Sequence, residues 1–462
     1  MAKYDLRSEF IATNAEGIQK IPQEWQIKQV RYLLKDGAEG IKIGPFGSAL
    51  KLEDMVEEGF SVYGQENVIK KDFTLGKRKI SETKFHEMSV YRIFPKDILI
   101  TMMGTSGKCE IVPKDVKDGI IDSHLLRVRV KENHIIPEFF KLLIDESPEI
   151  AYQIQVFGKG SIMHGLNSGI VKSLNLPLPS IAEQKHILSF LDHETAKIDH
   201  LIEKQQQLIE LLKEKRQAVI SHAVTKGLDP NVPMKDSGVE WLGEVPEHWV
   251  TSKLKYYTNQ IVDGAHFTPT YVESGVPFLR VTDIHNDEID MGNIKYIPES
   301  EHQELIKRCK PEIGDLLLSK NGTIGVAKLV NWDWQFSIFV SLCLIKFKKR
   351  LMAEFAEYFF KSYEIQEQIF GLTKKSTVIN LHLDKIQNFW FSIPPIDEQK
   401  EIVRTLDEKT KELNTLILKA ESAIQLMQER RTALISAAVT GKIDVRNWQA
   451  PTVAEADTEF SA

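Results

Sequence analysis

Two stretches of the sequence decide the fold: residues 179–229, which begin PSIAEQKHILSFLD and end EKRQAVISHAVTKGLD, and residues 394–444, which begin PPIDEQKEIVRTLD and end ERRTALISAAVTGKID. They align without a gap at a constant offset of 215 residues, and 23 of the 51 aligned positions are identical. Two unrelated amphipathic helices would not share that much sequence. The match therefore indicates an internal duplication, and a duplication of this kind organises the whole architecture.

Each stretch predicts one long helix with a narrow apolar stripe. Apolar residues recur at alternating spacings of three and four, which is the heptad pattern of a coiled coil. Ser180 with Glu183 forms a capping box at the start of the first stretch, and Gly227 and Gly441 lie just past the expected ends. We therefore expect helices of about 40 residues, or ~60 Å. The expected seam residues are Leu191, Ile198, Ile202, Ile209, Leu212, Val219, Leu406, Leu413, Ile417, Ile424, Met427 and Leu434.

Two such helices in one chain bury their seams most simply against each other. A globule separates them in the sequence, so the chain must return, and this favours an antiparallel pair. Three polar residues, Thr195, Gln205 and Arg216, interrupt the first seam at a cost in stability. Three roles stay open for them: they set the register, they contact a partner, or they are tolerated. The simplest role of the helix pair is that of a rigid spacer.

A longer and weaker repeat precedes each helix. It opens with IPQEW at residues 21–25 and with VPEHW at residues 245–249, and it later contains GTSG at 104–107 and GTIG at 322–325. The expected order is therefore globule, helix, globule, helix. The expected segments are an N-terminal segment (1–20), a first globule (21–178), a first repeated helix (179–229), a linker (230–244), a second globule (245–393), a second repeated helix (394–444) and a tail (445–462).

Short apolar runs broken by Gly and Pro, such as LLRVRV at 125–130 and FLRV at 278–281, predict strands in both globules. The expected fold class is mixed α+β: two strand-rich α/β domains and two long helices in an antiparallel coiled coil, related by a pseudo-twofold internal repeat. The acidic tail after Trp448 and part of the first ~15 residues are expected to be disordered.

Composition excludes several classes of protein. The 462 residues are 42% hydrophobic and 27% charged, as in an ordinary soluble globular chain, and only three cysteines are present, too few for a disulfide framework. No apolar run reaches the ~18 residues that a membrane span requires. The net charge of −6 argues against a surface that coats nucleic acid everywhere, because that affinity comes from neutralising phosphates. Any contact with nucleic acid must be local or shared with a partner.

Loops that combine Gly with Ser, Thr, His or Lys are candidates for phosphate contact. Small residues let a backbone approach a phosphate, hydroxyl and amide groups bond its oxygens, and Lys adds charge. Each loop alone is weak evidence, and the alternative is a plain surface turn. The candidate residues are Lys42, Ser48, Lys51, Lys159, Ser161, His266, Thr268, Lys320, Asn321, Lys374, Lys375, Ser376 and Thr377.

Base recognition would need Arg, Lys, Asn or Gln, or an acidic group facing cytosine. Residues 65–67 (Gln65, Glu66 and Asn67) and the set of Arg280, Thr282 and Asp283 occupy equivalent places in the two halves. They are the candidates for base contact. The alternative, that they are polar residues at strand ends, carries equal weight.

The sequence offers no clear enzymatic motif. Gly107-Lys108 resembles the end of a phosphate loop, but Cys109 follows it and Met102 stands where a glycine is needed. The segment Ile393-Pro394-Pro395 lacks the polar residue that opens an amino-methyltransferase motif, and the histidines have no metal-ligand spacing. We therefore expect a binding protein with no catalytic residues and no bound metal.

The heads IAEQK (181–185) and IDEQK (396–400), the tails AVT (223–225) and AVT (438–440), and the link DSGVEWLG (236–243) together resemble the specificity subunits of Type I DNA restriction-modification systems. The resemblance covers nearly the whole chain, and the paired repeat makes it specific. It implies that the globules are target recognition domains, each of which recognises one half of a split double-stranded DNA site, and that the repeated helices form an antiparallel coiled coil.

The resemblance further implies two methylation subunits, docked on helices from about Glu183 to Thr225 and from about Glu398 to Thr440, and optional restriction subunits. S-adenosylmethionine, ATP and magnesium would be bound by those partners and not by this chain. A spacer of ~60 Å corresponds to roughly one and a half to two duplex turns between domain centres. The expected setting is DNA methylation and phage defence in a prokaryotic cytoplasm.

Three alternative functions stay open at this point. The chain could be a nuclease with an unrecognised acidic site, which would show metal-dependent cleavage. It could be a duplicated scaffold for proteins or other non-DNA ligands, which would show no sequence preference. It could also be an orphan specificity subunit that acts in methylation only.

Overall fold

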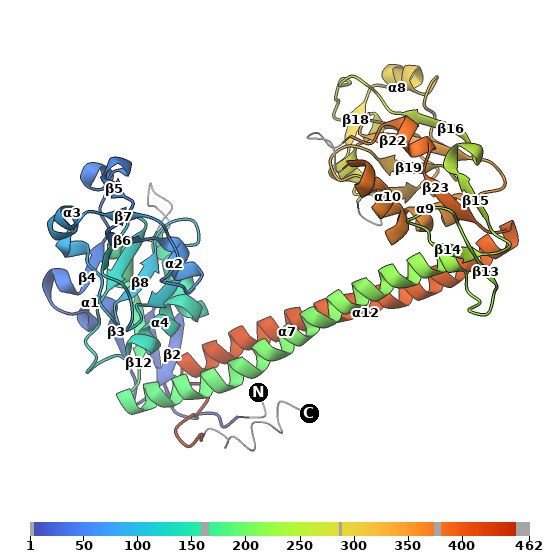
Figure 1. Ribbon diagram of the computed structural model, residues 1–462. Coiled ribbons are helices and arrows are strands. Elements are labelled where there is room, and N and C mark those ends of the chain that lie inside the picture. The colour runs from blue at the N-terminus through green and yellow to red at the C-terminus, as the bar shows by residue number, and fades with distance from the viewer. Residues whose placement is uncertain (1–3, 159–165, 286–288, 374–379, 450–462) are drawn as a thin grey trace. The chain divides into compact units, whose positions relative to one another are not determined.

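The computed structural model of the protein describes residues 4–158, 166–285, 289–373 and 380–449. The chain forms two compact units: residues 1–204 with 423–462, and residues 205–422. Each unit holds one globular domain and one half of each of two long helices, α7 (Ile181–Lys226) and α12 (Ile396–Val439) (Figure 1). The globular parts are termed the first and the second domain.

Two four-stranded sheets form the first domain, in the orders β4-β11-β8-β9 and β10-β6-β7-β5. The first sheet is antiparallel, and the second pairs β6 with β10 in parallel. All four residues of β8, ILIT, are buried, as expected of a strand that is covered on both faces. The strands are β4 (Ile41–Ile43), β5 (Met55–Val56), β6 (Phe60–Tyr63), β7 (Lys79–Ile80), β8 (Ile98–Thr101), β9 (Cys109–Ile111), β10 (Gly119–Ile121) and β11 (Leu125–Val128).

Helices and two short strand pairs surround these sheets. The pair β3 (Gln26–Gln29) and β12 (Asn175–Leu178) closes the domain just before α7, and β1 (Phe10–Ala15) and β2 (Ile18–Pro22) form a hairpin ahead of it. The helices are α1 (Val30–Leu33), α2 (Gln65–Ile69), α3 (Glu82–Glu87), α4 (Pro137–Glu146), α5 (Pro148–Gly158) and α6 (Ser168–Ser173).

The second domain repeats this plan. Its antiparallel sheet has the order β16-β22-β19-β20, and its second sheet, β18-β17-β21, again pairs two strands in parallel. The strands are β13 (Met234–Asp236), β14 (Glu244–Pro246), β15 (Val250–Lys253), β16 (Thr258–Asp263), β17 (Val276–Leu279), β18 (Lys295–Ile297), β19 (Leu316–Ser319), β20 (Ala327–Leu329), β21 (Ser337–Ile338), β22 (Leu342–Phe347) and β23 (Trp390–Ile393). The helices are α8 (Glu299–Leu305), α9 (Ala353–Phe360), α10 (Tyr363–Thr373) and α11 (Leu383–Gln387). The predicted fold class is confirmed.

Identical side-chain hydrogen bonds hold the two domains onto their helices. Gln184 in α7 accepts from the backbone N–H of Ile136 at 2.9 Å and donates to the carbonyl of His134 at 3.0 Å. Gln399 in α12 accepts from the N–H of Met352 at 2.8 Å and donates to a second carbonyl at 2.9 Å. Both glutamine side chains are fully buried, and buried amides need hydrogen-bond partners. The bonds described above provide these partners. The duplication therefore extends to individual contacts.

The long helices pair with each other in antiparallel orientation. In one unit Arg431 of α12 donates to Asp199 of α7 at 3.0 Å, and in the other Arg216 of α7 donates to Asn414 of α12 at 2.5 Å. One antiparallel register contains both pairs, because Asp199 precedes Arg216 along α7 whereas Arg431 follows Asn414 along α12. Arg216 therefore makes a contact across the seam, while the hydroxyl of Thr195 bonds the carbonyl of Leu191 within its own helix.

The predicted seam residues are buried or half-buried in the structure. Polar and half-buried positions, such as Gln205 and Ile202, alternate with the buried ones along the helices. Ile202, Val219, Ile424 and Met427 are half-buried. The fully buried seam residues are Leu191, Ile198, Ile209, Leu212, Leu406, Leu413, Ile417 and Leu434.

The start of α7 differs from the expected capping box in one arm. The hydroxyl of Ser180 accepts from the N–H of Glu183 at 3.3 Å, as predicted. The carboxylate of Glu183 does not return to Ser180; it accepts from the indole of Trp25 at 3.0 Å and pairs with Arg7. Glu398 in α12 accepts from Trp249 at 3.0 Å in the same way. These carboxylates dock the domain on its helix.

The two predicted terminating glycines adopt left-handed backbone conformations. Gly227 has φ of +80° and Gly441 has φ of +71°, and residues other than glycine rarely adopt these backbone conformations. A Cβ on Gly441 would lie 3.2 Å from the ring of Trp25, and one on Gly227 would lie 3.4 Å from the ring of Trp249. Each domain therefore rests on the start of one long helix and on the end of the other.

The N-terminal segment is more ordered than we predicted. We expected part of the first ~15 residues to be disordered, but β1 lies within them, and Leu6 forms a β-bridge with Ile443 beyond the end of α12. The N–H of Arg7 donates to the carbonyl of Lys442 at 3.2 Å. Backbone pairing with a distant segment orders these residues, and a local composition argument cannot detect such pairing. Most of the predicted tail, 450–462, lies outside the described residues.

No helix in the described part of the chain is both long and apolar enough to cross a membrane.

Candidate nucleic-acid interface

Strand ends bring the predicted loops of the first domain together. The N–H of Gly44, just after β4, donates to the carbonyl of Leu125 at 2.9 Å, and the N–H of Met102, just after β8, donates to that of His124 at 3.0 Å. The N–H of Asp122, just after β10, donates to the carbonyl of Tyr63 at the end of β6 at 2.9 Å. The loops at 44–51, 64–67, 102–107 and 122–124 therefore meet at one end of the domain.

The second domain gathers the equivalent loops. Backbone N–H groups donate from Gly264 to Leu342 at 3.3 Å, from Lys320 to Ser341 at 2.9 Å, and from Phe339 to Leu279 at 2.9 Å. The loops at 264–270, 280–285, 320–325 and 339–341 thus share one end of that domain. This shared loop end is the candidate interface of each domain.

Six predicted contact residues, Lys159, Ser161, Lys374, Lys375, Ser376 and Thr377, lie outside the described residues. The chain that follows them is placed: the N–H of Leu166 donates to Met102 at 2.9 Å, and the N–H of Leu381 donates to Lys320 at 2.8 Å. Both of these following segments therefore join the loop end of their own domain.

The two loop glycines pack against neighbouring backbone. A Cβ on Gly44 would lie 1.7 Å from the carbonyl oxygen of Asp122, and one on Gly264 would lie 2.1 Å from that of Ile338. These glycines are needed for close packing between neighbouring backbones, which fixes where each loop leaves its sheet. The predicted approach of these loops to a phosphate stays a prediction.

The predicted cations of the first domain are in part already engaged. The ammonium of Lys42 lies over the ring of Tyr91 at 5.0 Å, and that of Lys51 pairs with Glu53 at 2.9 Å on the exposed surface. An exposed pair of this kind is weak and leaves Lys51 able to turn toward another anion. Ser48 lies in a short 3-10 turn, Gly47–Ala49, and its side chain is not described.

Among the predicted base-contact residues of the first domain, Asn67 is structural. It is 1% exposed, its carbonyl oxygen accepts from the N–H of Gly64 at 2.9 Å, and its amide donates to the carbonyls of Asp72 and Leu75. Every polar atom of the Asn67 side chain is used, so its amide is not free for a base edge in this structure. Glu66 is exposed, and the buried side-chain oxygen of Gln65 has no hydrogen-bond partner in the described structure.

In the second domain Asp283 occupies the place of Asn67. It accepts from the N–H of Arg280 at 2.8 Å, the same cap that Asn67 forms with Gly64. Asp283 also receives the guanidinium of Arg280 in two bonds of 3.1 and 3.0 Å, and these bonds raise the pKa of Arg280. Asn67 and Asp283 therefore form the same cap in their own domains. Thr282 is exposed beside the pair.

The remaining predicted residues of the second domain divide into buried and exposed groups. Lys320 is 4% exposed and its ammonium lies 2.8 Å from Asp263, so it supports the loop and is not presented to a phosphate. Asn321 is half-buried and its backbone bridges Asn380. His266 and Thr268 are exposed on the loop after β16.

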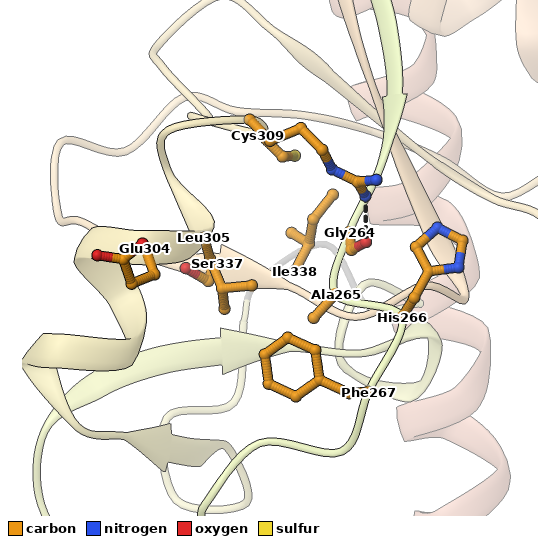
Figure 2. A pocket seen from close by; sticks show the side chains of 10 residues that line it. Gly264, Ala265, His266, Phe267, Glu304, Leu305, Cys309, Ser337 and Ile338 are labelled. Carbon is orange, nitrogen blue, oxygen red and sulfur yellow. Dashed lines mark hydrogen bonds between the residues drawn. The ribbon is translucent and has the colours of Figure 1, made fainter.

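Sequence reasoning missed the residue that holds this loop. The guanidinium of Arg308, after α8, donates to the carbonyls of Asp263 at 2.7 Å and Gly264 at 2.8 Å. In Figure 2 the loop residues Ala265, His266 and Phe267 border a hollow, which α8 and Ile338 close on the other sides. The hollow has a volume of about 260 Å³. No pattern around Arg308 points to this role, because its partners are backbone atoms far away in the sequence.

The described residues show no metal-binding constellation. No three His, Cys, Asp or Glu side chains gather there in a way that could hold a metal ion. The three cysteines are free and buried, and burial raises the pKa of the Cys309 thiol to about 12, so this thiol is neutral at physiological pH.

Comparison with known proteins accounts for this arrangement. A family model described as the Type I restriction modification DNA specificity domain matches residues 48–211 and again residues 266–424. The chain belongs to this family. Each match of the Type I specificity domain covers most of one globular domain and much of the long helix that follows it, so the family's unit is the unit that is duplicated here.

Curated relatives of this Type I specificity chain match along most of its length. The Type I restriction enzyme EcoBI specificity subunit of Escherichia coli is 23% identical over 368 residues, which cover 78% of this chain and 76% of that protein. The MjaVIII specificity subunit of Methanocaldococcus jannaschii is 24% identical over 341 residues, covering 72% and 76%.

Solved structures share the fold. A chain from work on complex assembly and conformational transition of the type I R-M system aligns with a TM-score of 0.68 at 17% identity, covering 92% of this chain and 100% of that chain. The HsdS subunit from Thermoanaerobacter tengcongensis aligns with a TM-score of 0.50 at 16% identity, covering 92% and 98%. At this identity the likeness concerns the fold of the Type I specificity chain and not its DNA site.

Proposed function

We propose that this chain recognises a bipartite double-stranded DNA site, with the loop end of each domain binding one half-site. The observation that carries the proposal is the duplicated loop end: two domains of one chain assemble equivalent loops from equivalent strand ends, as the shared cap of Asn67 and Asp283 demonstrates. Loops on a rigid sheet scaffold are the usual place of recognition residues.

The candidate contact residues are chosen by exposure or by an unsatisfied side-chain oxygen. Lys51 and Glu66 in the first domain, and His266 and Thr268 in the second, are exposed at the loop ends. Gln65 and Asn321 have buried side-chain oxygens without a partner in the described structure, and an acceptor of that kind gains from a donor on a base edge. Asn67 and Lys320 are left out of the contact set, because they already hold the loops.

The helix pair is proposed to set the gap between half-sites and to dock two methylation subunits. Heptad pairing explains the burial of the seam, but it does not explain the large apolar side chains that remain exposed outside it. Such residues support a protein partner along the helices. They are Leu201, Leu208, Leu211, Leu416, Leu418 and Leu426.

We further propose that the chain is non-catalytic. In this scheme S-adenosylmethionine would be bound by the methylation subunits, and ATP with magnesium by restriction subunits where these are present. An acidic chain, with its net charge of −6, can work in such a complex if the methylation subunits provide much of the phosphate contact.

Methylation mapping tests this proposal. The chain is expressed with the methylation subunit encoded beside it, in cells whose genomic DNA is then sequenced for modified bases. The expected result is a split motif with two specified ends and an unspecified centre. Methylation that is absent despite an assembled complex would favour a scaffold for non-DNA ligands, and metal-dependent cleavage by the isolated chain would overturn the non-catalytic assignment.

A further inference from the structure

Both loop ends expose a phenylalanine at nearly the same place. Phe46 follows the tightly packed Gly44 by two residues and is 60% exposed; Phe267 follows Gly264 by three residues and is 55% exposed. Single exposed apolar residues are common on protein surfaces and carry no message. Here two exposed phenylalanines lie in equivalent loops of duplicated domains, although the loop sequences have otherwise diverged. This coincidence points to a shared function of the two rings.

The second domain holds the backbone beneath Phe267 firmly. Arg308 bonds the carbonyls of Asp263 and Gly264, and the N–H of Ala265 donates to the carbonyl of Ile338 at 2.8 Å. Figure 2 shows the ring of Phe267 at the rim of the hollow, with His266 next to it on the same loop. The exposed aromatic ring thus projects from a fixed loop.

The first domain fixes its loop by different residues. Gly44 packs against Asp122, and Gly47 adopts φ of +60°, which turns the chain directly after Phe46. Lys42, at the centre of β4, lies over Tyr91. The two domains have kept the exposed ring while changing the residues that support it, so packing alone does not explain the ring.

We propose that Phe46 and Phe267 each contact an apolar base surface in the half-site bound by their own domain. This inference rests on the proposed DNA-binding function and deepens it. The apolar surface is either the methyl group of thymine or the face of a partly unstacked base, because phenylalanine is used against both. Each ring therefore helps to specify one position of one half-site.

The test uses the full chain in its complex with methylation subunits, as Phe46→Ala and Phe267→Ala. Truncation of a ring that is more than half exposed removes little buried surface, so both variants are expected to fold. We expect Phe46→Ala to relax one position in one half-site and Phe267→Ala to relax one position in the other. Affinity for the cognate site should fall about 5- to 150-fold, the range typical of one mismatched base pair, with affinity for random DNA unchanged.

Two tyrosines provide matched controls. Tyr32 is 64% exposed and Tyr256 is 61% exposed, and they precede β4 and β16, the strands whose far ends carry the two phenylalanine loops. Tyr32→Ala and Tyr256→Ala remove a similar exposed ring from the same domains. They are expected to keep the motif and to change the affinity less than about twofold, well below the loss from a base contact. If Phe46→Ala fails to assemble, a Phe46→Leu variant replaces it. This variant retains an apolar group and should keep part of the selectivity.

Modified DNA separates the two sources of apolar surface. Replacing thymine by uracil in the affected half-site removes only the methyl group. If the wild-type complex then loses as much affinity as Phe46→Ala does, and the Phe46→Ala complex loses no more, the ring contacts the methyl group. If uracil has no effect and 2-aminopurine placed there brightens on binding, the ring contacts an unstacked base.

The outcomes also separate this inference from the proposed function. A wild-type complex without a split motif would defeat the proposed function itself. A wild-type complex with a split motif, together with phenylalanine variants that behave like the tyrosine controls, would defeat only the assignment of Phe46 and Phe267.

Discussion

The guanidinium of Arg431 in α12 lies 3.0 Å from the carboxylate of Asp199 in α7, and its other arm reaches Glu146 at the end of α4 at 2.6 Å. The contact joins two helices and the first domain through one half-buried side chain. The internal repeat places Arg216 opposite Asn414 in the second unit. The register of the helix pair is thus marked twice by an arginine on the seam.

We expect Arg431→Met to lower the free energy of unfolding by about 1 kcal/mol, because two partly exposed carboxylates lose their partner while some packing is kept. Urea unfolding followed by circular dichroism measures the change. The matched control is Arg404→Met, which removes an exposed pair with Glu408 at 3.5 Å and should cost less than about 0.5 kcal/mol. Equal losses of unfolding free energy in Arg431→Met and Arg404→Met would contradict a role of Arg431 in setting the register of the helix pair.

Shortening the helix pair in register should shorten the gap between half-sites. Deletion of residues 202–208 from α7 together with 422–428 from α12 keeps both arginine contacts and removes one heptad from each helix. Seven residues span ~10.5 Å, or about 3 base pairs. Methylation mapping should show the same half-sites with a shorter centre. Deletion from α7 alone breaks the register and should abolish assembly, whereas an unchanged gap in the double deletion would refute the spacer role.

Exchange of the first globule, residues 22–178, for that of another chain of this family should change one half-site only. The domain carries its own sheets and loop end, so its specificity should travel with it. Methylation mapping of the chimaera gives the result directly. A change in both half-sites would contradict independent recognition by the two domains.

Gly44→Ala should destabilise the first domain by about 1–3 kcal/mol, because the new Cβ would meet the carbonyl oxygen of Asp122 at 1.7 Å and the backbone must move. Thermal melting checks the loss, and mapping should show weakened recognition of one half-site. Gly158→Ala is the control, since nothing lies within 4 Å of its Cβ position. A neutral Gly44→Ala would contradict close packing between Gly44 and the carbonyl of Asp122.

Asn67→Asp should also cost about 1–3 kcal/mol, because a buried donor pair to Asp72 and Leu75 is replaced by an acceptor. If Asn67 only holds the loop, the base identities of the half-site stay the same while affinity falls. Gln65→Ala is the informative contrast: its unpartnered oxygen predicts little loss of stability, and a changed base preference would make Gln65 a recognition residue.

The N-terminal segment should make stability sensitive to alkaline pH. Burial and contact with Glu194 raise the pKa of Tyr4 to about 12, whereas an unfolded tyrosine ionises near pH ~10. The stabilisation from Tyr4 is therefore complete below about pH 10 and is lost as the pH rises toward 12, because the unfolded chain releases the proton first. The difference in unfolding free energy between wild type and Tyr4→Phe should shrink across this window. Tyr152→Phe, at an exposed tyrosine, should show no such trend.

Local and repeated signals explain which parts of the site were predictable. Asn67 and Asp283 occupy equivalent places in the two halves of the sequence, and each caps its loop in the structure. Their chemistry was not visible, because an amide can donate to Asp72 and Leu75 whereas a carboxylate accepts Arg280. Both side chains thus cap a loop, and Asp283 also binds the guanidinium of Arg280.

The sequence by itself determined the duplication, the two long helices and their antiparallel pairing. The gap-free repeat and the heptad spacing are local patterns in the order of residues, and the globule between the helices requires the chain to return. Only the tertiary structure decided that Lys320 is buried against Asp263, that Arg308 holds the loop after β16, and that the first residues pair with the segment after α12. Those contacts join atoms that are distant in the chain. The energy of these contacts depends on burial and on distance in space, and neither quantity can be derived from local sequence patterns.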